Sequence, residues 1–535
     1  MQGADQGKPS RLWAAVVASA LLQAAAHPPW SLWPLALVVV APVCAVLLDP
    51  RSTIGWKRAA AAGFAFGTLA TWMMVGPWSW PAASAFFPRS SLEAAGFTIA
   101  MPLLASGIAL HYAVAFALVS RLAGLGALAG VVGSAAIWAA TEWARTSLGY
   151  GNPWGAFAAS LVQADASLST FHAVTPVASL LGLGGPPAVA LLAASCGSAI
   201  GLAWACRPSA VERGRALATG AVVVAALLGA ARAGDALAPA RAASLVPKAP
   251  LRVALVQSGL GGSRLWERSG AAESFDRNVE LTRGFETKGA DLVVWPENAL
   301  PFLLDANADR RDALRALARE RGAALLVGGS RTSKGSDGRT AVYNSAFLFP
   351  ADGGEPLVYD KRVLLPFLEH VPGWIAPFLE SPWQGAFSPG EGPGVFAVKD
   401  WKIAPLMCFE AIYPGEVAAR VAGGADLLVN MSNDSWFDEG AGPEQHFALA
   451  ALGAAESRRP LVRVASTGVS GLVREDGLVA WRLPVRTGAV ALLDVAPPRR
   501  DSLYDHGGRA GFAILVGVVA LGAALVPARK EDADG

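Results

Sequence analysis

The chain has 535 residues, of which 53% are hydrophobic and 16% are charged. Soluble domains are about one quarter charged, so this composition argues against a wholly soluble protein and predicts a membrane part. The formal net charge is +2 and no basic stripe with interleaved aromatics occurs, so no nucleic-acid partner is expected.

Apolar runs dominate the chain before residue 245 and return near its C-terminus. They cover residues 12–26, 32–48, 59–76, 96–119, 124–141, 184–205, 216–231 and 511–526. A helix that crosses a bilayer needs about 20 largely apolar residues, and several of these runs are somewhat short. Eight runs together still favour membrane helices over buried soluble helices. Lys8 and Arg11 precede the first run as in a signal peptide, but a second run follows at once and favours an uncleaved helix.

The runs divide the chain into domains. We expect a membrane domain over residues 1–235 with about seven helices, followed by a linker over 236–250 that is rich in Ala and Pro. A polar domain over 251–497 comes next. A C-terminal membrane helix over 510–527 and a cytoplasmic tail over 528–535 complete the chain.

Lys and Arg gather in alternate loops between the apolar runs, and loops of this kind face the cytoplasm. The basic loops and ends carry Lys8, Arg11, Arg51, Lys57, Arg58, Arg121, Arg207, Arg213, Arg215, Arg529 and Lys530. This bias predicts a cytoplasmic N-terminus. Seven crossings then place the polar domain on the outer side of the membrane.

The segment TEWARTSLGYGNPWGAF, at residues 141–157, joins charged residues to Gly, Asn, Pro and Trp at the edge of an apolar run. Glu142 and Arg145 are spaced i, i+3 and can form an ion pair on a helix. The segment is either a structured loop or a contact with a lipid headgroup, and the sequence leaves both open.

From Leu251 onward, short apolar runs alternate with polar segments of helical spacing, which predicts an α/β domain of packed layers. The expected strands are LRVALVQ, ADLVVWPE, AALLVGGS, VYNSAFLFP, IAPLMCF, ADLLVNMS and PLVRVAST, with a late hairpin in LVREDGLVAW. Helices are expected within Arg264–Gly289 and in DANADRRDALRALARERGA.

Three of these strands end in residues that can do chemistry. LVVWPE ends at Glu297, IAPLMC ends at Cys408, and LLVNMSND ends at Asn433 and Asp434. Polar groups just past strand ends converge on the functional crevice of α/β folds. A further segment, YDKRVLLPFLEHVP, supplies Lys361 and Glu369.

Cys408 is the candidate nucleophile, since a thiolate is intrinsically reactive. A buried Glu297 can take the thiol proton and the amine of Lys361 can stabilise an oxyanion. An inert buried cysteine is the competing interpretation, and a Cys–His pair has no supporting pattern. The other cysteines, Cys44, Cys196 and Cys206, lie in or beside apolar runs. No CxxC occurs, and no metal or organic cofactor is implied.

The motifs WPEN, YDK-x₄-PF-x-E-x-VP and CFE resemble the nitrilase superfamily, which uses a Glu-Lys-Cys triad, here Glu297, Lys361 and Cys408. With HPPWSLWPLAL, TEWAR…NPW and SNDSWFDEGAGPEQHF, nearly the whole chain resembles the bacterial apolipoprotein N-acyltransferase family. The resemblance implies a multi-pass bundle of about eight helices carrying an α-β-β-α sandwich, in the inner membrane with the sandwich on the periplasmic side.

The resemblance also implies further site residues. Glu369 matches the family's second glutamate, which supports the lysine, and Glu410 matches an acidic residue beside the cysteine. Trp266 and Trp436 lie where the family has aromatics near the lipid or on mobile loops, although simple packing explains them equally well. The chain departs from the family at Phe409, where Tyr is common, at Asp438, where Gly is usual, and at LLGLGGPPAV, where an aromatic-Gly pair is common.

The implied reaction moves a fatty acyl chain from a phospholipid to the free α-amino group of the N-terminal diacylglyceryl-cysteine of an apolipoprotein, through a thioester on Cys408. The expected partners are the phospholipid donor, the lipoprotein acceptor and the bilayer, and the protein is expected to be a monomer. Two alternatives stay open. One is a membrane-tethered amidase with the same triad, and the other is an inactive paralogue that binds lipid or lipoprotein.

Overall fold

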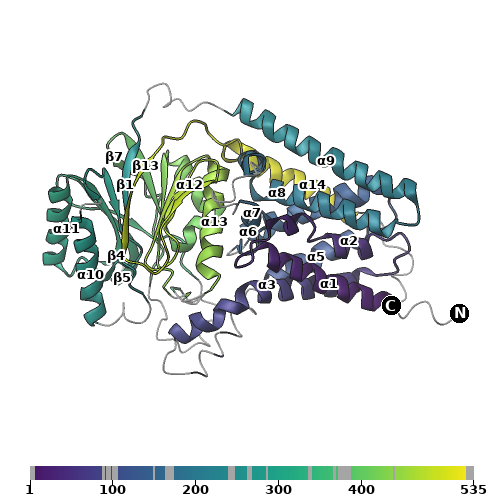
Figure 1. Ribbon diagram of the computed structural model, residues 1–535, viewed down its shortest axis with the longest axis horizontal. Helices are drawn as coiled ribbons and strands as arrows, with labels where there is room; N and C mark the ends of the chain where they lie inside the picture. Colours follow the sequence, from purple (N-terminus) through teal and green to yellow (C-terminus); the bar gives the residue numbers. More distant parts are fainter. Residues whose placement is uncertain are drawn as a thin grey trace. The chain divides into compact units, whose positions relative to one another are not determined.

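The computed structural model describes residues 7–86, 91, 95, 98, 107–148, 151–162, 174–238, 248–261, 268–284, 287–334, 340–365, 369–370, 387–435, 437 and 440–525. The chain packs into two compact units (Figure 1). We call them the helical unit, residues 1–239, 439–456 and 501–535, and the sheet unit, residues 240–438 and 457–500.

Helices make up the described part of the helical unit. They are α1 (Gly7–Ala26), η1 (Trp33–Leu37), α2 (Ala41–Leu47), α3 (Trp56–Phe86), α5 (Gly107–Ser120), η2 (Ala129–Gly133), α6 (Ser134–Ser147), α7 (Phe157–Val162), α8 (Val174–Ala205), α9 (Ala210–Leu237), α13 (Gly442–Ser457), η9 (Tyr504–Gly508) and α14 (Arg509–Ala524). Each predicted apolar run therefore falls at least partly on helix.

The prediction of eight membrane helices is not confirmed. Within the described ranges, three helices are long and apolar enough to cross a membrane: Trp56–Pro77, Val177–Ala205 and Ala210–Leu237. The second predicted run is split between η1 and α2, each of which has a proline in its first turn. The fifth run starts in a turn and then contains the π-helical turn η2. Length and composition alone could not reveal these interruptions.

Small residues and aromatic rings pack the helical unit. Gly63 and Gly67 of α3 face α5 so closely that a Cβ on Gly67 would lie 2.6 Å from the Cα of Ala109. Beside this contact, the ring of Phe66 lies 5.0 Å from Tyr112 and 5.8 Å from Trp138, both edge-on. Close backbone approach of this kind is typical of helices that pack within a membrane.

Two sheets form the sheet unit. The first has the order β13-β1-β2-β4-β5-β6, with β3 beside β4, and the second has the order β12-β11-β10-β9-β8-β7. The strands of the first sheet are β1 (Leu251–Gln257), β2 (Leu292–Val294), β3 (Leu300–Leu303), β4 (Ala324–Lys334), β5 (Thr340–Phe349), β6 (Leu357–Asp360) and β13 (Ala489–Val495). Those of the second are β7 (Phe396–Val398), β8 (Trp401–Met407), β9 (Leu427–Ser432), β10 (Leu461–Ala465), β11 (Gly471–Val473) and β12 (Val479–Arg482).

Alternate side chains of β1 show how the layers form. Val253 and Leu255 lie in a core shared with Ile403 and Val429 of the second sheet. Ala254 and Val256 point the other way, into a core with α10 (Arg268–Arg283) and α11 (Ala308–Arg321). Figure 1 shows these two helices on the outer face of the first sheet, and α12 (Pro414–Ala422) packs beside β8 of the second. The predicted α/β sandwich is therefore confirmed.

The central strands run parallel, which sets the position of the functional residues. β1, β2 and β4 are mutually parallel in the first sheet, and β8, β9 and β10 are parallel in the second.

The seven predicted strands and the β11–β12 hairpin all form. The strands β3, β6, β7 and β13 and the helices α12 and α13 were not predicted, mostly because they are short. β13 is long, but its register is defined only by its antiparallel partner β1.

Candidate active site

The end of β2 delivers Glu297 into the interior of the sheet unit. Trp295 anchors this segment, since it is fully buried and its indole N–H donates to the Thr282 hydroxyl at 2.8 Å. Glu297 itself is only 3% exposed. Gly328 of β4 makes this path possible, because a Cβ there would lie 2.7 Å from the Cα of Glu297. The GG pair of the predicted strand AALLVGGS thus includes a glycine that the backbone crossing requires.

Three segments donate hydrogen bonds to the Glu297 carboxylate. Oε1 accepts from the Asn344 amide at 2.8 Å and from the Lys361 ammonium at 3.1 Å. Oε2 accepts from the backbone N–H of Asn433 at 3.0 Å. Burial raises the pKa of Glu297 above its ordinary value, and the nearby Lys361 offsets this only in part. A carboxylate with a raised pKa is suited to accept a proton near neutral pH.

Lys361 follows β6 and is 1% exposed, so its charge is fully desolvated. Its ammonium lies between two carboxylates, at 3.1 Å from Glu297 and 2.9 Å from Glu369. Burial alone lowers the pKa of Lys361, but the two carboxylates more than compensate and hold that pKa well above its ordinary value. The side chain is therefore a permanent cation at this position.

Glu369 is fixed in place by its neighbours as well as by the lysine. It accepts the second N–H of the Asn344 amide at 2.9 Å and the backbone N–H of Leu365 at 2.8 Å. The Asn344 amide therefore bridges the two carboxylates, because it donates one hydrogen to Glu297 and the other to Glu369. The role that the family resemblance gives to Glu369, support of the lysine, agrees with these contacts.

Cys408 begins the short turn η8 (Cys408–Ile412) at the end of β8. Its φ of +50° is left-handed, which is costly for a residue with a Cβ. Asn430 of β9 holds this turn by donating to the carbonyls of Leu406 and Cys408, at 2.8 and 3.1 Å. A strained conformation fixed by neighbouring strands is common at functional sites.

The thiol of Cys408 is buried, with 3% of the residue exposed, and burial raises its pKa well above the ordinary value. The charge on Glu297 raises this pKa further, whereas Lys361 lowers it. Both groups thus act electrostatically on the sulfur. A thiol with a raised pKa needs a base to become a nucleophile.

Glu410 connects the cysteine turn to the lysine segment. Its Oε1 accepts the Tyr359 hydroxyl and the backbone N–H of Arg362 at 2.7 Å each, and that of Val363 at 3.2 Å. Its Oε2 accepts the backbone N–H of Met407 at 2.8 Å. Arg420 of α12 lies 3.4 Å from the same oxygen. The buried Glu410 carboxylate therefore holds the backbone after Lys361 and the backbone before Cys408 in fixed positions.

The remaining predicted residues fall into two groups. Asn433 contributes its backbone N–H to Glu297, and the Asp434 carboxylate pairs with the buried Arg463 at 2.7 Å. Trp266, Trp436 and Asp438 lie outside the described residues.

The sequence interpretation missed Asn344 and Asn430, although each is a lone amide within a buried strand, and such a position demands a hydrogen-bond partner.

The described residues of the TEWAR segment, 141–148 and 151–157, belong to the helical unit. Arg145 and Glu142 form the predicted ion pair at 2.8 Å, and both side chains are buried. Arg145 also donates to the carbonyls of Asn152 and Trp154, at 2.8 and 2.9 Å. With no exposed surface left, this arginine cannot reach a lipid headgroup, so the contacts support the structured-loop alternative.

Two family models match the chain. Residues 19–199 match the apolipoprotein N-acyltransferase N-terminal domain, and residues 252–502 match the carbon-nitrogen hydrolase family. An apolipoprotein N-acyltransferase of Azotobacter vinelandii is 32% identical, over 98% of this chain and 97% of the relative. The chain belongs to the apolipoprotein N-acyltransferase family.

One further relative and one solved structure are also similar to this chain. The apolipoprotein N-acyltransferase of Brucella suis is 31% identical over 78% of this chain and 77% of the relative. A mutant of an amidase from the nitrilase superfamily of Nesterenkonia AN1 is similar in structure, with a TM-score of 0.37 and 23% identity. It covers 51% of this chain and 99% of the amidase. Membership of the apolipoprotein N-acyltransferase family also agrees with the apolar helices of the chain, which are typical of a membrane protein.

Proposed function

We propose that this protein transfers a fatty acyl chain from a phospholipid to the α-amino group of a diacylglyceryl-cysteine at the N-terminus of an apolipoprotein. Cys408 is the nucleophile, Glu297 is the general base and acid, and Lys361 stabilises the oxyanion. One observation carries the proposal. The buried Lys361 ammonium pairs with the carboxylates of Glu297 and Glu369. The charges of Lys361 and Glu297 also both shift the pKa of the Cys408 thiol.

In the first half-reaction, Glu297 accepts the thiol proton while the Cys408 sulfur attacks the ester carbonyl of the donor. The carbonyl oxygen becomes an oxyanion, which Lys361 stabilises together with a backbone N–H near Cys408. When the tetrahedral intermediate collapses, its bond to the glycerol oxygen breaks, and Glu297 returns the proton to that oxygen. The products are a lysophospholipid and a thioester on Cys408.

In the second half-reaction, the neutral amine of the acceptor attacks the thioester carbon and loses a proton to Glu297. Collapse of this second intermediate breaks the carbon–sulfur bond, and the proton passes from Glu297 to the departing sulfur. The products are an amide on the lipoprotein and the free thiol.

Because both substrates are anchored in lipid, we also propose that the chain crosses the inner membrane eight times and that the sheet unit faces the periplasm. The domain boundaries are those proposed from the sequence.

Intact-protein mass spectrometry tests the covalent intermediate. Protein incubated with phospholipid and no acceptor should gain the mass of one fatty acyl group, and hydroxylamine should remove it. A variant with Cys44, Cys196 and Cys206 replaced by serine should form the same adduct, which would localise it to Cys408. Adding a diacylated lipopeptide should then discharge the acyl group onto the peptide amine.

Discharge onto water alone would contradict acyl transfer and favour the amidase alternative. If no adduct forms although thiol reagents modify Cys408, the covalent mechanism is wrong and the binding-paralogue alternative leads.

The acidic side of the pH profile should report Glu297. Since burial raises its pKa above 4.5, kcat/KM for the phospholipid donor should decline with falling pH at an inflection above 4.5. The folded protein binds this proton more tightly than the unfolded chain. The stability that this carboxyl contributes is therefore fully present below pH 4.5 and is lost as the pH rises through its raised pKa. The measurement is kcat/KM from about pH 4 to about pH 9.

Glu297→Gln is the control for the pH profile, because it keeps the shape of the side chain and removes its titration. It should lower kcat/KM by about 10²- to 10⁴-fold and abolish the acidic inflection. An inflection that stays at the same pH in this variant would show that another group titrates.

A further inference from the structure

The helical unit contains a second candidate ligand site, apart from the Glu297, Lys361 and Cys408 cluster. We propose that an open pocket between α1, α2 and the end of α8 binds an anionic phospholipid, with the phosphate on arginines and the acyl chains along α2 and α8. The proposal is independent of the acyl-transfer function. None of the residues that line this pocket belongs to the sheet unit.

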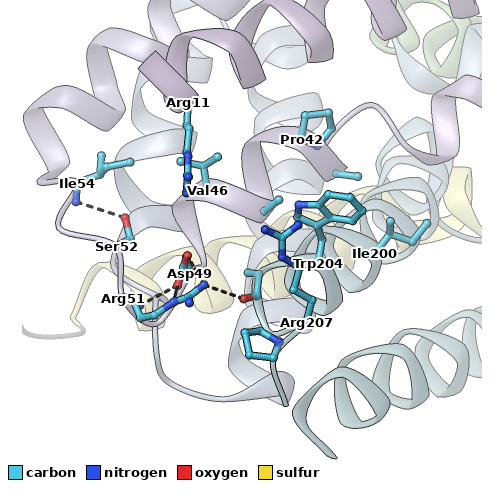
Figure 2. A pocket seen from close by; sticks show the side chains of 15 residues that line it. Arg11, Pro42, Val46, Asp49, Arg51, Ser52, Ile54, Ile200, Trp204 and Arg207 are labelled. Carbon is cyan, nitrogen blue, oxygen red and sulfur yellow. Dashed lines mark hydrogen bonds and ion pairs between the residues drawn. The ribbon is translucent and has the colours of Figure 1, made fainter. Parts of the chain in front are cut away.

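Figure 2 shows the side chains that line the pocket. Its volume is about 950 Å³. This volume is comparable with that of sites for ligands of several hundred daltons. Helix α1 contributes Arg11, and the loop after α2 contributes Asp49, Arg51, Ser52 and Ile54. The last turn of α8 contributes Trp204, and the turn after it contributes Arg207. The wall is apolar and consists mainly of Ala41, Pro42, Ala45, Val46, Ile200, Gly201 and Ala205.

Positive charge exceeds negative charge at the mouth of this pocket. Arg51 is already engaged, because it forms two hydrogen bonds to Asp49, at 3.0 and 3.1 Å, and a third to the Ala205 carbonyl at 3.3 Å. Arg11 and Arg207 form no ion pair with any residue that the structure describes. Three guanidinium groups therefore face one carboxylate. Guanidinium groups match phosphate oxygens in geometry, so the excess favours an anionic phosphate ligand.

The apolar wall distinguishes a lipid from a free anion. Trp204 is 65% exposed, and the guanidinium of Arg207 lies 5.2 Å from the centroid of its ring. Figure 2 labels both side chains in the wall of the pocket. Ile200, one turn earlier on α8, is also exposed. Inorganic phosphate gains nothing from such a surface, whereas an acyl chain does. A tryptophan beside arginines at the end of an apolar helix is typical of the membrane interface.

Close packing of α2 on α8 forms the floor of the pocket. A Cβ on Gly201 would lie 2.8 Å from the Cβ of Cys44. Arg51 ties the loop after α2 to the last turn of α8 through the Ala205 carbonyl. The pocket is therefore built from segments that are fixed to each other. The distribution of lysine and arginine among the loops assigns Arg11, Arg51 and Arg207 to the cytoplasmic side of the membrane. Anionic lipids on that side attract basic residues.

Native mass spectrometry of the full-length protein in detergent tests the proposal. Phosphatidylglycerol should stay bound to the wild-type protein at concentrations where phosphatidylcholine does not. The double variant Arg11→Gln/Arg207→Gln should weaken phosphatidylglycerol binding by about tenfold or more. Its melting temperature without added lipid should stay close to that of the wild type, since neither arginine forms an ion pair with another described residue. The contact of Arg207 with the exposed Trp204 ring contributes little to stability.

Arg58→Gln is the matched control, because Arg58 is exposed near the start of α3 and does not line the pocket. It should leave phosphatidylglycerol binding unchanged. The proposal is overturned if the double variant binds as tightly as wild type, or if Arg58→Gln weakens binding equally, which would indicate general charge attraction. It is also overturned if inorganic phosphate displaces the lipid at similar concentrations, because the site would then recognise a soluble anion.

Discussion

Cys408→Ala is expected to reduce acyl transfer by about 10⁴-fold or more, since the other three cysteines belong to the helical unit, apart from Glu297 and Lys361. The variant should also show no acyl adduct after incubation with phospholipid. Both half-reactions pass through the same sulfur, so both should be lost together. The measurement is transfer of a labelled acyl group to a diacylated lipopeptide, with adduct formation followed in parallel.

The fold should tolerate this change. Alanine keeps the Cβ that already occupies the left-handed conformation at φ +50°, so no new backbone strain arises. Removing one buried sulfur should shift the melting temperature by only about 4 °C or less. Residual transfer above a few per cent in a fully folded variant would show that Cys408 is not the nucleophile. Transfer lost through unfolding would appear as a much larger shift in melting temperature.

Lys361→Met is expected to abolish activity and to destabilise the protein. The carboxylates of the buried Glu297 and the partly buried Glu369 both pair with this ammonium, at 3.1 and 2.9 Å. Removing one partner of a buried ion pair typically costs about 3–5 kcal/mol, because an uncompensated charge is left behind. Loss of an oxyanion donor costs a further factor of about 10²–10³ in rate. Thermal unfolding and the lipopeptide assay measure the two effects separately.

A second substitution separates stability from catalysis. In Lys361→Met/Glu369→Gln, one of the two uncompensated carboxylates is gone, so the melting temperature should rise again towards that of the wild type. Activity should stay absent, because no cation is left to stabilise the oxyanion. If the double variant is no more stable than Lys361→Met, the carboxylates are not energetically coupled through the lysine. If it regains activity, the assigned role of Lys361 is wrong.

The sequence suggested which strand ends lie near each other, but not the contacts between them. Glu297 and Cys408 each follow a short apolar strand, so the strand-end rule led us to expect them close together, and the charge on Glu297 does act on the Cys408 thiol. The position of Lys361 came from its motif. Asn344 was missed because a sequence does not show that one amide lies between Glu297 and Glu369. The role of Glu410 depends on donors at residues 359, 362 and 407, which meet only in the folded chain.

Membrane helices were predicted from hydropathy with less success. Apolar residues do form helices throughout the helical unit, because a hydrophobic segment gains from helical hydrogen bonding when water is excluded. Hydropathy does not show where a helix ends, however. Gly185 adopts φ +65° and ψ −164° inside α8, beside Pro186 and Pro187, so the helix continues before the start of the predicted run, across a kink. Such breaks come from local backbone geometry rather than from average hydrophobicity.

Helix α13 limits how the protein can be divided into fragments. In the chain it joins β9 to β10, yet residues 439–456 pack as part of the helical unit. The Gln445 amide donates to the carbonyls of Pro28 and Met74, at 2.9 and 3.1 Å, and accepts the indole N–H of Trp154 at 2.5 Å. In a fragment limited to residues 251–497, Gln445 would lose its three partners, Pro28, Met74 and Trp154. It would also expose apolar surface of this helix and should aggregate unless α13 is redesigned for water.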